Sequence, residues 1–285
     1  MNYFFSCYPS KQSSAGGFSF LNLLVKVLKK NRKFKKNWQE SDLILVNSHH
    51  WINSVFRIIL LRLKGKRFVL RIDGPLNLYR SSNIAFFEDR LIYSFALNIS
   101  SGIIFQSAWS AEENFNNKKS LQSLPFAIIH NGGYDFKMRK SLVDRDEACL
   151  FVANSTNKFK GFDLYKDFAK KSLLIEELKD LKFYSAGNVD SSKEDLININ
   201  NCGSLNKEDL YKLMQKVKYY IHPSIYEACS NALIESINNG MIPFVYNGTS
   251  NREIVSDKRL KFKNIDELVS IVIKIRKDKT NKFDV

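Results

Sequence analysis

The sequence HPSIYEACSNALIE occupies residues 222–235. The β-branched and aromatic residues before it predict a strand that ends where the stretch begins, and Ser230 or Asn231 can cap a helix after the loop. Glu227 then lies in the loop and Glu235 in the helix. Backbone N–H groups at a helix N-terminus favour a diphosphate, and carboxylates accept hydrogen bonds from sugar or ribose hydroxyls. The stretch predicts either a phosphosugar site or a solvated surface helix.

Apolar runs of four to seven residues alternate with amphipathic segments on both sides of this stretch. The alternation is typical of a parallel sheet covered by helices. In the first half we predict strands at residues 3–7, 43–47, 68–72, 102–106 and 127–130. The helices between them are expected at residues 18–30, 51–64, 87–97 and 110–115, with Ser107 and Ser110 as candidate N-caps.

The same alternation restarts in the second half. There we predict strands at residues 149–153, 182–186, 219–222 and 244–246. The helices are expected at residues 164–174, 207–214, 231–238 and 265–276. The polar passage at residues 137–147 separates the two series and is a candidate linker. We therefore predict two α/β domains, residues 1–140 and 141–285, each a doubly wound parallel sheet that binds ligands at the carboxyl ends of its strands. Two such domains facing each other would enclose a cleft.

The composition restricts the protein class. Of 285 residues, 44% are hydrophobic and 26% are charged, which excludes disordered, collagen-like and disulfide-scaffold chains. The longest apolar runs fall far short of the roughly 20 residues that a membrane-spanning helix needs. The N-terminus lacks the basic start of a secretory signal, so we expect a cytoplasmic protein. Its four cysteines are widely separated, and neither a zinc pattern nor another metal motif is present.

The positive charge is concentrated in the first half. Residues 1–140 hold 21 Lys and Arg against 8 Asp and Glu, a balance of +13, whereas residues 141–285 balance at +2. Such asymmetry indicates a polyanionic partner. The densest run is Lys26 to Lys36, interleaved with Val25, Leu28 and Phe34. This run is either a basic amphipathic helix that lies on an anionic membrane, with the protein peripheral on its inner face, or a solvated helix face.

The stretch at residues 222–235 resembles the donor-site signature of the retaining glycosyltransferases of family 4. Glu227 and Glu235 match its E-x7-E pattern, and Gly240 and Pro243 follow in register. Further matches run along nearly the whole chain in the family's order, at Gly16-Gly17, Asn131-Gly132-Gly133, Lys160-Gly161-Phe162-Asp163 and Ala186-Gly187-Asn188. The resemblance implies a GT-B fold, two Rossmann-like domains with a nucleotide-diphosphate sugar held mainly by the second. It also implies retention of anomeric configuration, with no metal and no cofactor.

The resemblance also implies site residues. The residues expected to be catalytic are Lys160, which neutralises the leaving diphosphate, Glu227, which contacts the transferred sugar, and Asp73. Donor-binding residues are expected at Gly16, Gly17, Lys158, Asn188, Ala228, Cys229, Ser230, Asn231 and Glu235. Candidates on the acceptor side are His49, Asp73 and Trp109. We interpret His50 and His222 as packed strand-end residues.

One departure from the family concerns charge at the donor site. The family usually has an arginine about five residues before the lysine, where this sequence has Asn154-Ser155-Thr156. Lys158 can supply the second charge, without the bidentate fork of arginine. Catalysis is therefore expected to be weakened or altered.

Three functions remain open. The leading one is transfer of a sugar to a glycan or lipid-linked glycan in cell-surface polysaccharide or glycoconjugate synthesis. The sequence leaves the donor nucleotide undetermined, with UDP and GDP among the candidates. A nucleotide-sugar-binding protein that has lost turnover is the first alternative. Nucleic-acid binding is the remoter one, because the basic half lacks any recognition motif, and we expect no specific nucleic-acid partner.

Overall fold

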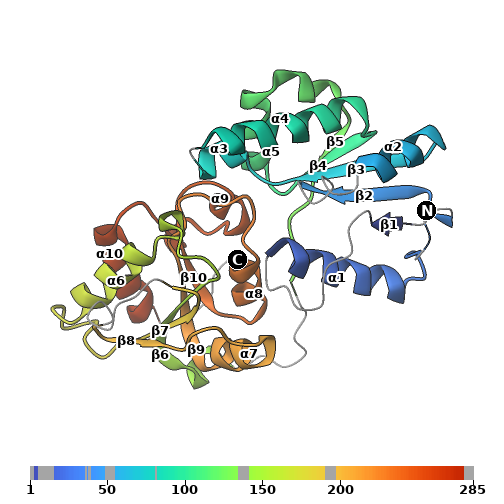
Figure 1. Ribbon diagram of the computed structural model, residues 1–285. Helices are drawn as coiled ribbons and strands as arrows, with labels where there is room; N and C mark the ends of the chain where they lie inside the picture. Colours follow the sequence, from blue (N-terminus) through green and yellow to red (C-terminus); the bar gives the residue numbers. More distant parts are fainter. Residues whose placement is uncertain are drawn as a thin grey trace. The chain divides into compact units, whose positions relative to one another are not determined.

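The chain forms two compact units, residues 1–132 and 133–285. The computed structural model describes residues 3–5, 16–35, 37, 40–48, 55–80, 82–133, 141–189 and 197–278. Each unit is a parallel sheet covered by helices (Figure 1). Within these described ranges, none of the helices combines the length and the apolar character needed to cross a bilayer.

The sheet of the first unit has five parallel strands in consecutive order. They are β1 (Tyr3–Phe5), β2 (Leu43–Asn47), β3 (Arg67–Ile72), β4 (Gly102–Phe105) and β5 (Phe126–Ile128). The three inner strands are largely buried on both faces, as expected for a covered parallel sheet. Because the strands are parallel, their carboxyl ends meet at one edge of the sheet, where the polar residues that follow each strand come together.

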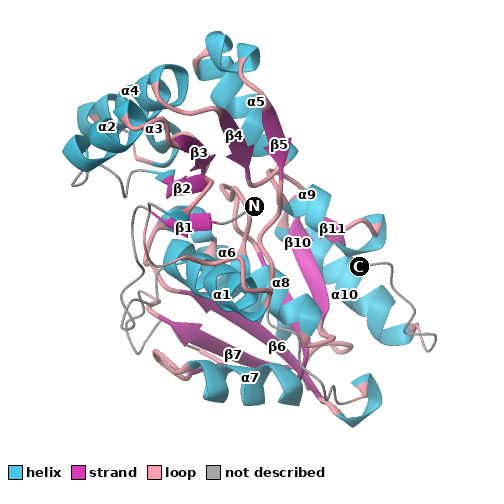
Figure 2. Ribbon diagram, turned by 90° about the vertical axis from the view of Figure 1, so that its right-hand side faces the viewer, coloured by secondary structure: helices cyan, strands magenta, loops and turns pink. Residues whose placement is uncertain are grey.

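Alternate residues of these strands face different helices, because the side-chain period of a strand is two. Leu45 of β2 packs against α1 (Gly16–Lys30) through Leu21 and Val25. Ile44 and Val46 face the other side. That side is covered by α2 (Val55–Leu63), α4 (Asn83–Asn98) and α5 (Ala108–Asn117), while α3 (Leu76–Tyr79) precedes α4. Figures 1 and 2 both show α1 on one side of the strands and α2 with α4 on the other.

The β1-α1-β2 crossover has the opposite hand to the other three crossovers of this sheet. The strands advance in one direction from β1 to β5, so a crossover on one face has one hand and a crossover on the other face has the other hand. Among the helices that the structure describes in this unit, α1 packs on one face and α2, α4 and α5 pack on the other, so the first βαβ unit departs from the uniform handedness that consecutive parallel strands usually show.

The second unit has a six-stranded parallel sheet in the order β11-β10-β9-β6-β7-β8, which in chain order within the unit is 6-5-4-1-2-3. Its strands are β6 (Asp146–Ala153), β7 (Lys182–Gly187), β8 (Ile199–Asn201), β9 (Val217–His222), β10 (Ile242–Tyr246) and β11 (Lys261–Phe262). This is the Rossmann order, and its direction reverses between β6 and β9. The loops after those two strands lie at this switch point, where such sheets bind ligands.

Helices cover both faces of the second sheet. They are α6 (Phe162–Ser172), α7 (Lys207–Lys216), α8 (Asn231–Asn238), α9 (Asn251–Ile254) and α10 (Ile265–Lys277). Figure 2 shows α6 and α7 on opposite sides of β6 and β7. Tyr165 and Phe168 of α6 pack edge-on against Phe183 of β7, and α10 packs beside α6. One continuous core holds this unit together.

The strands and helices predicted from periodicity are present, and most of them have changed ends. The predicted strand at residues 127–130 is β5, which begins at Phe126 and ends at Ile128. Residues 6–7 and 51–54 of the first predicted strand and the second predicted helix lie outside the described residues. Besides the 3₁₀ helices of the described residues, the prediction omitted four short α-helices and strands, α3, α9, β8 and β11. They contain two to four residues, too few to show a period.

Two of the predicted boundaries are wrong. Ser107 caps α5 by accepting a hydrogen bond from Ser110 N, so Ser110 lies inside the helix and is not its cap. The candidate linker does not extend to residue 147, because β6 begins at Asp146. Arg145 is buried beside it and donates to Met214 O of α7 and to Asn239 O at the end of α8. Its guanidinium thereby satisfies carbonyls that helix ends leave open.

Candidate functional site in the second unit

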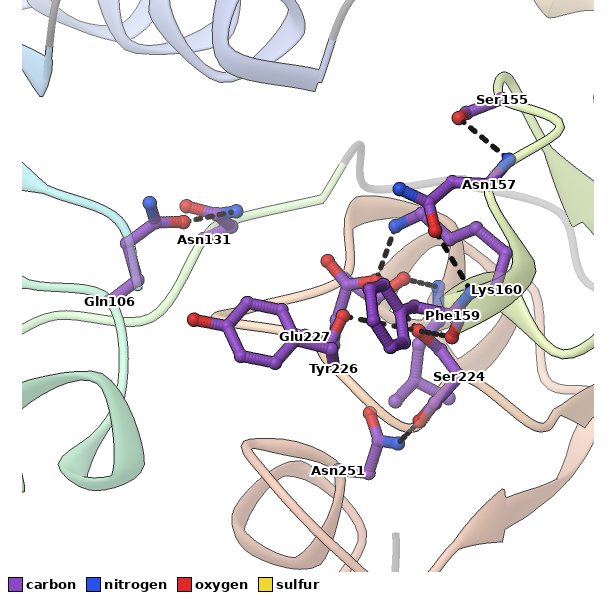
Figure 3. Close-up of polar contacts among 12 residues, drawn as sticks. Gln106, Asn131, Ser155, Asn157, Phe159, Lys160, Ser224, Tyr226, Glu227 and Asn251 are labelled. Carbon is purple, nitrogen blue, oxygen red and sulfur yellow. Dashed lines mark hydrogen bonds and ion pairs between the residues drawn. The ribbon is translucent and has the colours of Figure 1, made fainter. Parts of the chain in front are cut away.

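Two loops meet at the carboxyl edge of the second sheet (Figure 3). One follows β6 and carries a 3₁₀ helix, Lys158–Lys160, before α6 begins. The other follows β9 and runs from Pro223 to the N-terminus of α8. Ile225 N donates to Phe159 O at 3.0 Å, so the loops are joined through their backbones. The two strands are neighbours in the sheet, which places their loops side by side.

Lys160 and Glu227 form an ion pair where these loops meet. Lys160 Nζ lies 2.6 Å from Glu227 Oε2, and the two side chains are 24% and 15% exposed. The Ser224 hydroxyl lies 3.3 Å from the same carboxylate oxygen and 3.2 Å from Phe159 O. The carboxylate is therefore held by a cation from one loop and a hydroxyl from the other.

The backbone around Glu227 is fixed by the segment after β10. Ser250 N donates to Glu227 O at 3.2 Å. The buried Asn251 side chain donates to Ser224 O at 2.9 Å. These bonds bring a third loop of the sheet edge into the site.

Gly161 lets the two loops approach each other. Its φ is +76°, a left-handed conformation that favours glycine. A Cβ atom at this position would lie 2.6 Å from Pro223 O, a distance that Cβ atoms in proteins essentially never show. Only a glycine permits this approach without displacement, and the residue before it is Lys160. The Lys-Gly sequence therefore sets the distance over which Lys160 reaches Glu227.

The electrostatics of the site keep Glu227 charged and His222 neutral. Burial alone would raise the pKa of Glu227, but Lys160, with the smaller contributions of His222 and Ser224, outweighs it and holds that pKa below its ordinary value. Burial lowers the pKa of His222 to about 4. His222 is 4% exposed, and its ring stacks on the Tyr220 ring with 5.9 Å between the ring centres. The prediction that His222 is a packed strand-end residue is confirmed.

Helix α8 presents its N-terminus and Glu235. Ser230 caps the helix by accepting a hydrogen bond from Leu233 N, which decides between the two candidate caps. Asn231 is consequently the first helical residue, and Ala228 and Cys229 belong to the loop. Burial raises the pKa of Glu235, and Lys207 partly offsets this. A half-buried carboxylate of this kind is suited to accept hydrogen bonds from a polyhydroxylated ligand.

The remaining candidates of this unit lie on neighbouring loops. Asn188 is exposed and follows Gly187, which pairs with Ala153 at the end of β6. Lys158 is exposed and its ammonium lies 5.6 Å from the centre of the Phe159 ring. Lys158, Asn188 and the Lys160–Glu227 pair therefore occur on loops after adjacent strands.

In the first unit, a buried arginine occupies the carboxyl edge of the sheet. Arg71 is 1% exposed and donates to Asn47 Oδ1 at 2.8 Å and to Asn131 Oδ1. Its guanidinium stacks on Phe20 at 4.0 Å and lies 3.4 Å from Asp73 Oδ1. One side chain thus joins the ends of β2 and β3 with the chain after β5 and with α1.

This network holds Asp73 in place. The Asp73 carbonyl accepts hydrogen bonds from Ser110 Oγ at 3.1 Å and from Asn114 Nδ2 at 2.9 Å. The carboxylate is 41% exposed and therefore accessible to a ligand. Trp109, on the same helix as Ser110, is 8% exposed.

The other candidates of the first unit are the glycine pair and His49. Gly16 and Gly17 are the first two residues of α1 rather than part of a loop. The helix predicted at residues 18–30 therefore begins two residues earlier than expected. His49 and His50 lie outside the described residues.

Sequence reasoning missed the residues that position the site. Ser224 lies within residues 222–235, and its position beside a strand end was the signal that could have identified it. Asn251 of the second unit carried no local signal, and neither did Asn47 and Gln106 of the first unit. Gln106 accepts a hydrogen bond from Asn131 Nδ2 at 3.2 Å, and each of the three residues bonds to a residue distant in sequence. Within the described ranges, no three His, Cys, Asp or Glu side chains group closely enough to hold a metal ion.

The family model described as glycosyl transferases group 1 matches residues 134–284, more than half of the chain. The chain belongs to this family. The matched region contains the Lys160–Glu227 pair and α8. No curated protein matches this group 1 glycosyl transferase in sequence.

Solved structures resemble this group 1 glycosyl transferase over most of its length. HepE from Anabaena, in complex with UDP and glucose, has a TM-score of 0.66 and 14% identity over 95% of this chain and 76% of HepE. A mutant of S. aureus TarM, in complex with fondaparinux, alpha-GlcNAc-glycerol and UDP, has a TM-score of 0.65 and 14% identity, with 92% and 52% covered.

A third similar structure is the sucrose-phosphate synthase from Thermosynechococcus elongatus, with a TM-score of 0.65 and 14% identity over 96% of this chain and 73% of that enzyme. The chain spans about half the length of TarM and about three quarters of the other two. At these identities the likeness establishes the fold, which is GT-B with two Rossmann-like domains.

Proposed function

We propose that this protein is a retaining glycosyltransferase of family 4. It transfers a sugar from a nucleotide-diphosphate sugar to a hydroxyl of a glycan or lipid-linked glycan, in the synthesis of a cell-surface polysaccharide or glycoconjugate. The observation that carries the proposal is the Lys160–Glu227 ion pair, formed beside the N-terminus of α8 at the switch point of a Rossmann sheet. The E-x7-E spacing of Glu227 and Glu235 supports it.

The donor binds at α8. The N–H groups of the first helical turn, with the positive end of the helix dipole, favour the diphosphate, and Glu235 accepts hydrogen bonds from the ribose. Glu227 accepts hydrogen bonds from hydroxyls of the sugar. UDP is the first nucleotide to test, because HepE and TarM were each solved with UDP.

Departure of the diphosphate leads the reaction. Negative charge grows on the leaving phosphate, and a cation already in place stabilises that charge more in the transition state than in the ground state. Lys160 supplies this cation and Lys158 adds a second one, so the charge is neutralised without a metal. The acceptor hydroxyl then attacks the sugar from the face that the diphosphate leaves, and its proton passes to an oxygen of the departing diphosphate. Attack from this face retains the anomeric configuration.

The ion pair keeps both partners ready for this role. Without a donor, Glu227 neutralises Lys160 in a largely buried place. Donor binding brings a phosphate to Lys160 and hydroxyls to Glu227, so each partner exchanges one polar contact for another. We assign the acceptor side to the first unit, with Asp73, His49 and Trp109 as candidates and Gly16 with Gly17 on the diphosphate side.

The deciding experiment measures melting temperature with UDP, GDP, ADP, CMP and their sugars. A ligand that binds the folded state raises the melting temperature by mass action. We expect a rise with one nucleotide diphosphate, lost in Glu235→Ala and kept in Glu208→Ala, which removes an exposed carboxylate of α7. Proton NMR of the product made from an α-linked donor then shows whether the anomer is retained. An inverted product contradicts the retaining assignment.

A nucleotide-sugar-binding protein without turnover is the second candidate. The observation that favours it is Asn154-Ser155-Thr156, where the family usually has an arginine. Release of free nucleotide from the donor in the absence of acceptor distinguishes the two functions, since hydrolysis requires a working site. Donor binding with no nucleotide release supports the second candidate.

A further inference from the structure

Helix α2 of the first unit is apolar on two opposite sides. Ile58 and Leu61 are 1% and 3% exposed and pack on the sheet. The other side carries four exposed large apolar residues at a spacing of three and four, with exposed fractions between 44% and 78%: Phe56, Ile59, Leu60 and Leu63. At about 100° per residue these four form one stripe along the helix. We refer to them as the α2 stripe.

Cations flank the α2 stripe on both sides. At the same rotation per residue, Arg57 and Lys64 lie along one border of the stripe and Arg62 along the other, and all three are exposed. Residues 43–72 contain no Asp or Glu. The exposed side of α2 therefore combines an apolar centre with a basic border.

The basic run of α1 is different. Lys26, Lys29 and Lys30 are exposed, but the apolar side of that helix is used in the core, where Leu21 and Val25 pack on the sheet. Among the α1 side chains that the structure describes, residues 20–30, Val27 is the one large apolar side chain that is exposed. The sequence left this run open between a membrane-binding helix and a solvated face, and its part in α1 offers charge with little apolar surface.

We propose that α2 docks on an anionic lipid bilayer, with the α2 stripe at the level of the headgroups and acyl chains and Arg57, Arg62 and Lys64 at the lipid phosphates. An apolar face bordered by cations is the pattern of a helix that lies in a membrane interface. Lys and Arg reach the headgroups while their methylene stems stay on apolar surface. This inference goes beyond the proposed function and stands whether or not the chain transfers a sugar.

Charge argues against a second copy of the chain as the occupant. In a symmetric pairing of two α2 stripes, the same surface meets itself. The borders would then bring arginines and lysines together with no carboxylate of α2 to offset them. A nucleic acid fits poorly as well. Its phosphates could pair with the cations, but they offer no apolar surface to cover the α2 stripe.

The next helix of the same layer extends the apolar surface. Ile84, Phe86 and Phe87 of α4 are 70%, 56% and 62% exposed. Figures 1 and 2 both show α2 and α4 on the same side of the sheet. A membrane that receives α2 therefore has further large side chains within the same helix layer to receive.

The first test is flotation of the full chain with vesicles of phosphatidylcholine alone and with about a third phosphatidylglycerol. We expect binding to the anionic vesicles, and we expect Phe56→Asn/Leu63→Asn to lower the partition coefficient at least about tenfold. The control Leu174→Asn removes a side chain of the second unit that is 87% exposed and should bind as the wild type does. Circular dichroism melting shows that the variants are folded.

The second test separates the two basic helices. Arg57→Gln/Arg62→Gln/Lys64→Gln should abolish the preference for anionic vesicles, and Lys26→Gln/Lys29→Gln/Lys30→Gln should reduce it only slightly, because α1 and α2 lie on opposite faces of the sheet. The opposite ranking overturns the proposal. Unchanged binding by Phe56→Asn/Leu63→Asn also overturns it. A third result would overturn it as well: the wild type fails to float and sediments as a dimer, and Phe56→Asn/Leu63→Asn dissociates that dimer. The α2 stripe would then bind a second copy of the chain.

Discussion

Lys160 Nζ lies 2.6 Å from Glu227 Oε2, although the two residues are 67 positions apart and follow different strands of the second sheet. Three features create this contact. The strands β6 and β9 are neighbours, Gly161 permits the backbones of their loops to touch, and Ser224 and Asn251 hold the Glu227 loop. The pair is therefore a product of the fold around it rather than of either loop alone.

We predict that Lys160→Ala lowers turnover far more than donor affinity. If Lys160 stabilises charge that grows on the leaving diphosphate, its loss should lower kcat on the order of 100-fold, with a much smaller change in the dissociation constant of the donor. Nucleotide release measured beside calorimetric donor binding separates the two quantities. Lys170→Ala, which removes an exposed cation of α6, should leave both unchanged. Full turnover in Lys160→Ala would show that another group carries the charge.

Gly161→Ala should destabilise the second unit and weaken catalysis together. A non-glycine residue at positive φ costs about 1–2 kcal/mol, and the clash of its Cβ with Pro223 O adds to that cost while displacing Lys160. Gly203 has a φ of +62° with nothing within 4 Å of a Cβ, so Gly203→Ala pays only the conformational part. Urea unfolding and nucleotide release of both variants isolate the close approach. Equal effects in the two variants would contradict the role given to Gly161.

Stability should fall as the pH is lowered from about 6.5 to about 4, in part through His222. The pKa of this histidine is lowered from its ordinary 6.5 to about 4 because the ring is buried. In that interval the unfolded chain binds a proton that the folded chain does not, so unfolding becomes easier by about 1.4 kcal/mol per pH unit, about 3 kcal/mol in all. Above the interval the contribution is constant. The depressed pKa of Glu227 acts in the same direction at lower pH.

Urea unfolding across this pH range tests the assignment. His222→Gln should flatten the slope, whereas His130→Gln, which removes an exposed histidine, should keep the slope of the wild type. If His222→Gln is too unstable to measure, NMR titration of the His222 ring in the wild type reads its pKa directly. A ring that titrates near its ordinary pKa would contradict the prediction.

Arg71→Lys should destabilise the first unit by roughly 3–5 kcal/mol. A lysine keeps the charge but loses the planar group that donates to Asn47 and Asn131 and stacks on Phe20, and the polar groups around it stay buried. Arg67→Lys, at the exposed start of the same strand, is the matched control and should cost little. The melting temperatures of the two variants give the comparison. Similar melting temperatures would show that the network contributes nothing specific to arginine.

The sequence by itself determined the type and order of the main elements. Strand and helix periods are properties of neighbouring residues, so β2 was predicted with its observed ends, and α8 with its observed residues. The spacing of Glu227 and Glu235 was readable for the same reason, because both lie in one strand-loop-helix segment. Elements of two to four residues, such as β8 and α9, lacked enough residues to show a period.

The tertiary structure decided what the loops do together. Whether Lys160 meets Glu227 depends on which strands are neighbours, and strand order is set by packing between distant segments. The same holds for Arg71, which lay within the strand predicted at residues 68–72 and is the buried centre of four segments. It also holds for α1 and α2, whose sequences are both basic and apolar. Packing buried the apolar side of α1 and left one apolar side of α2 exposed, because a helix can place only one face on a sheet.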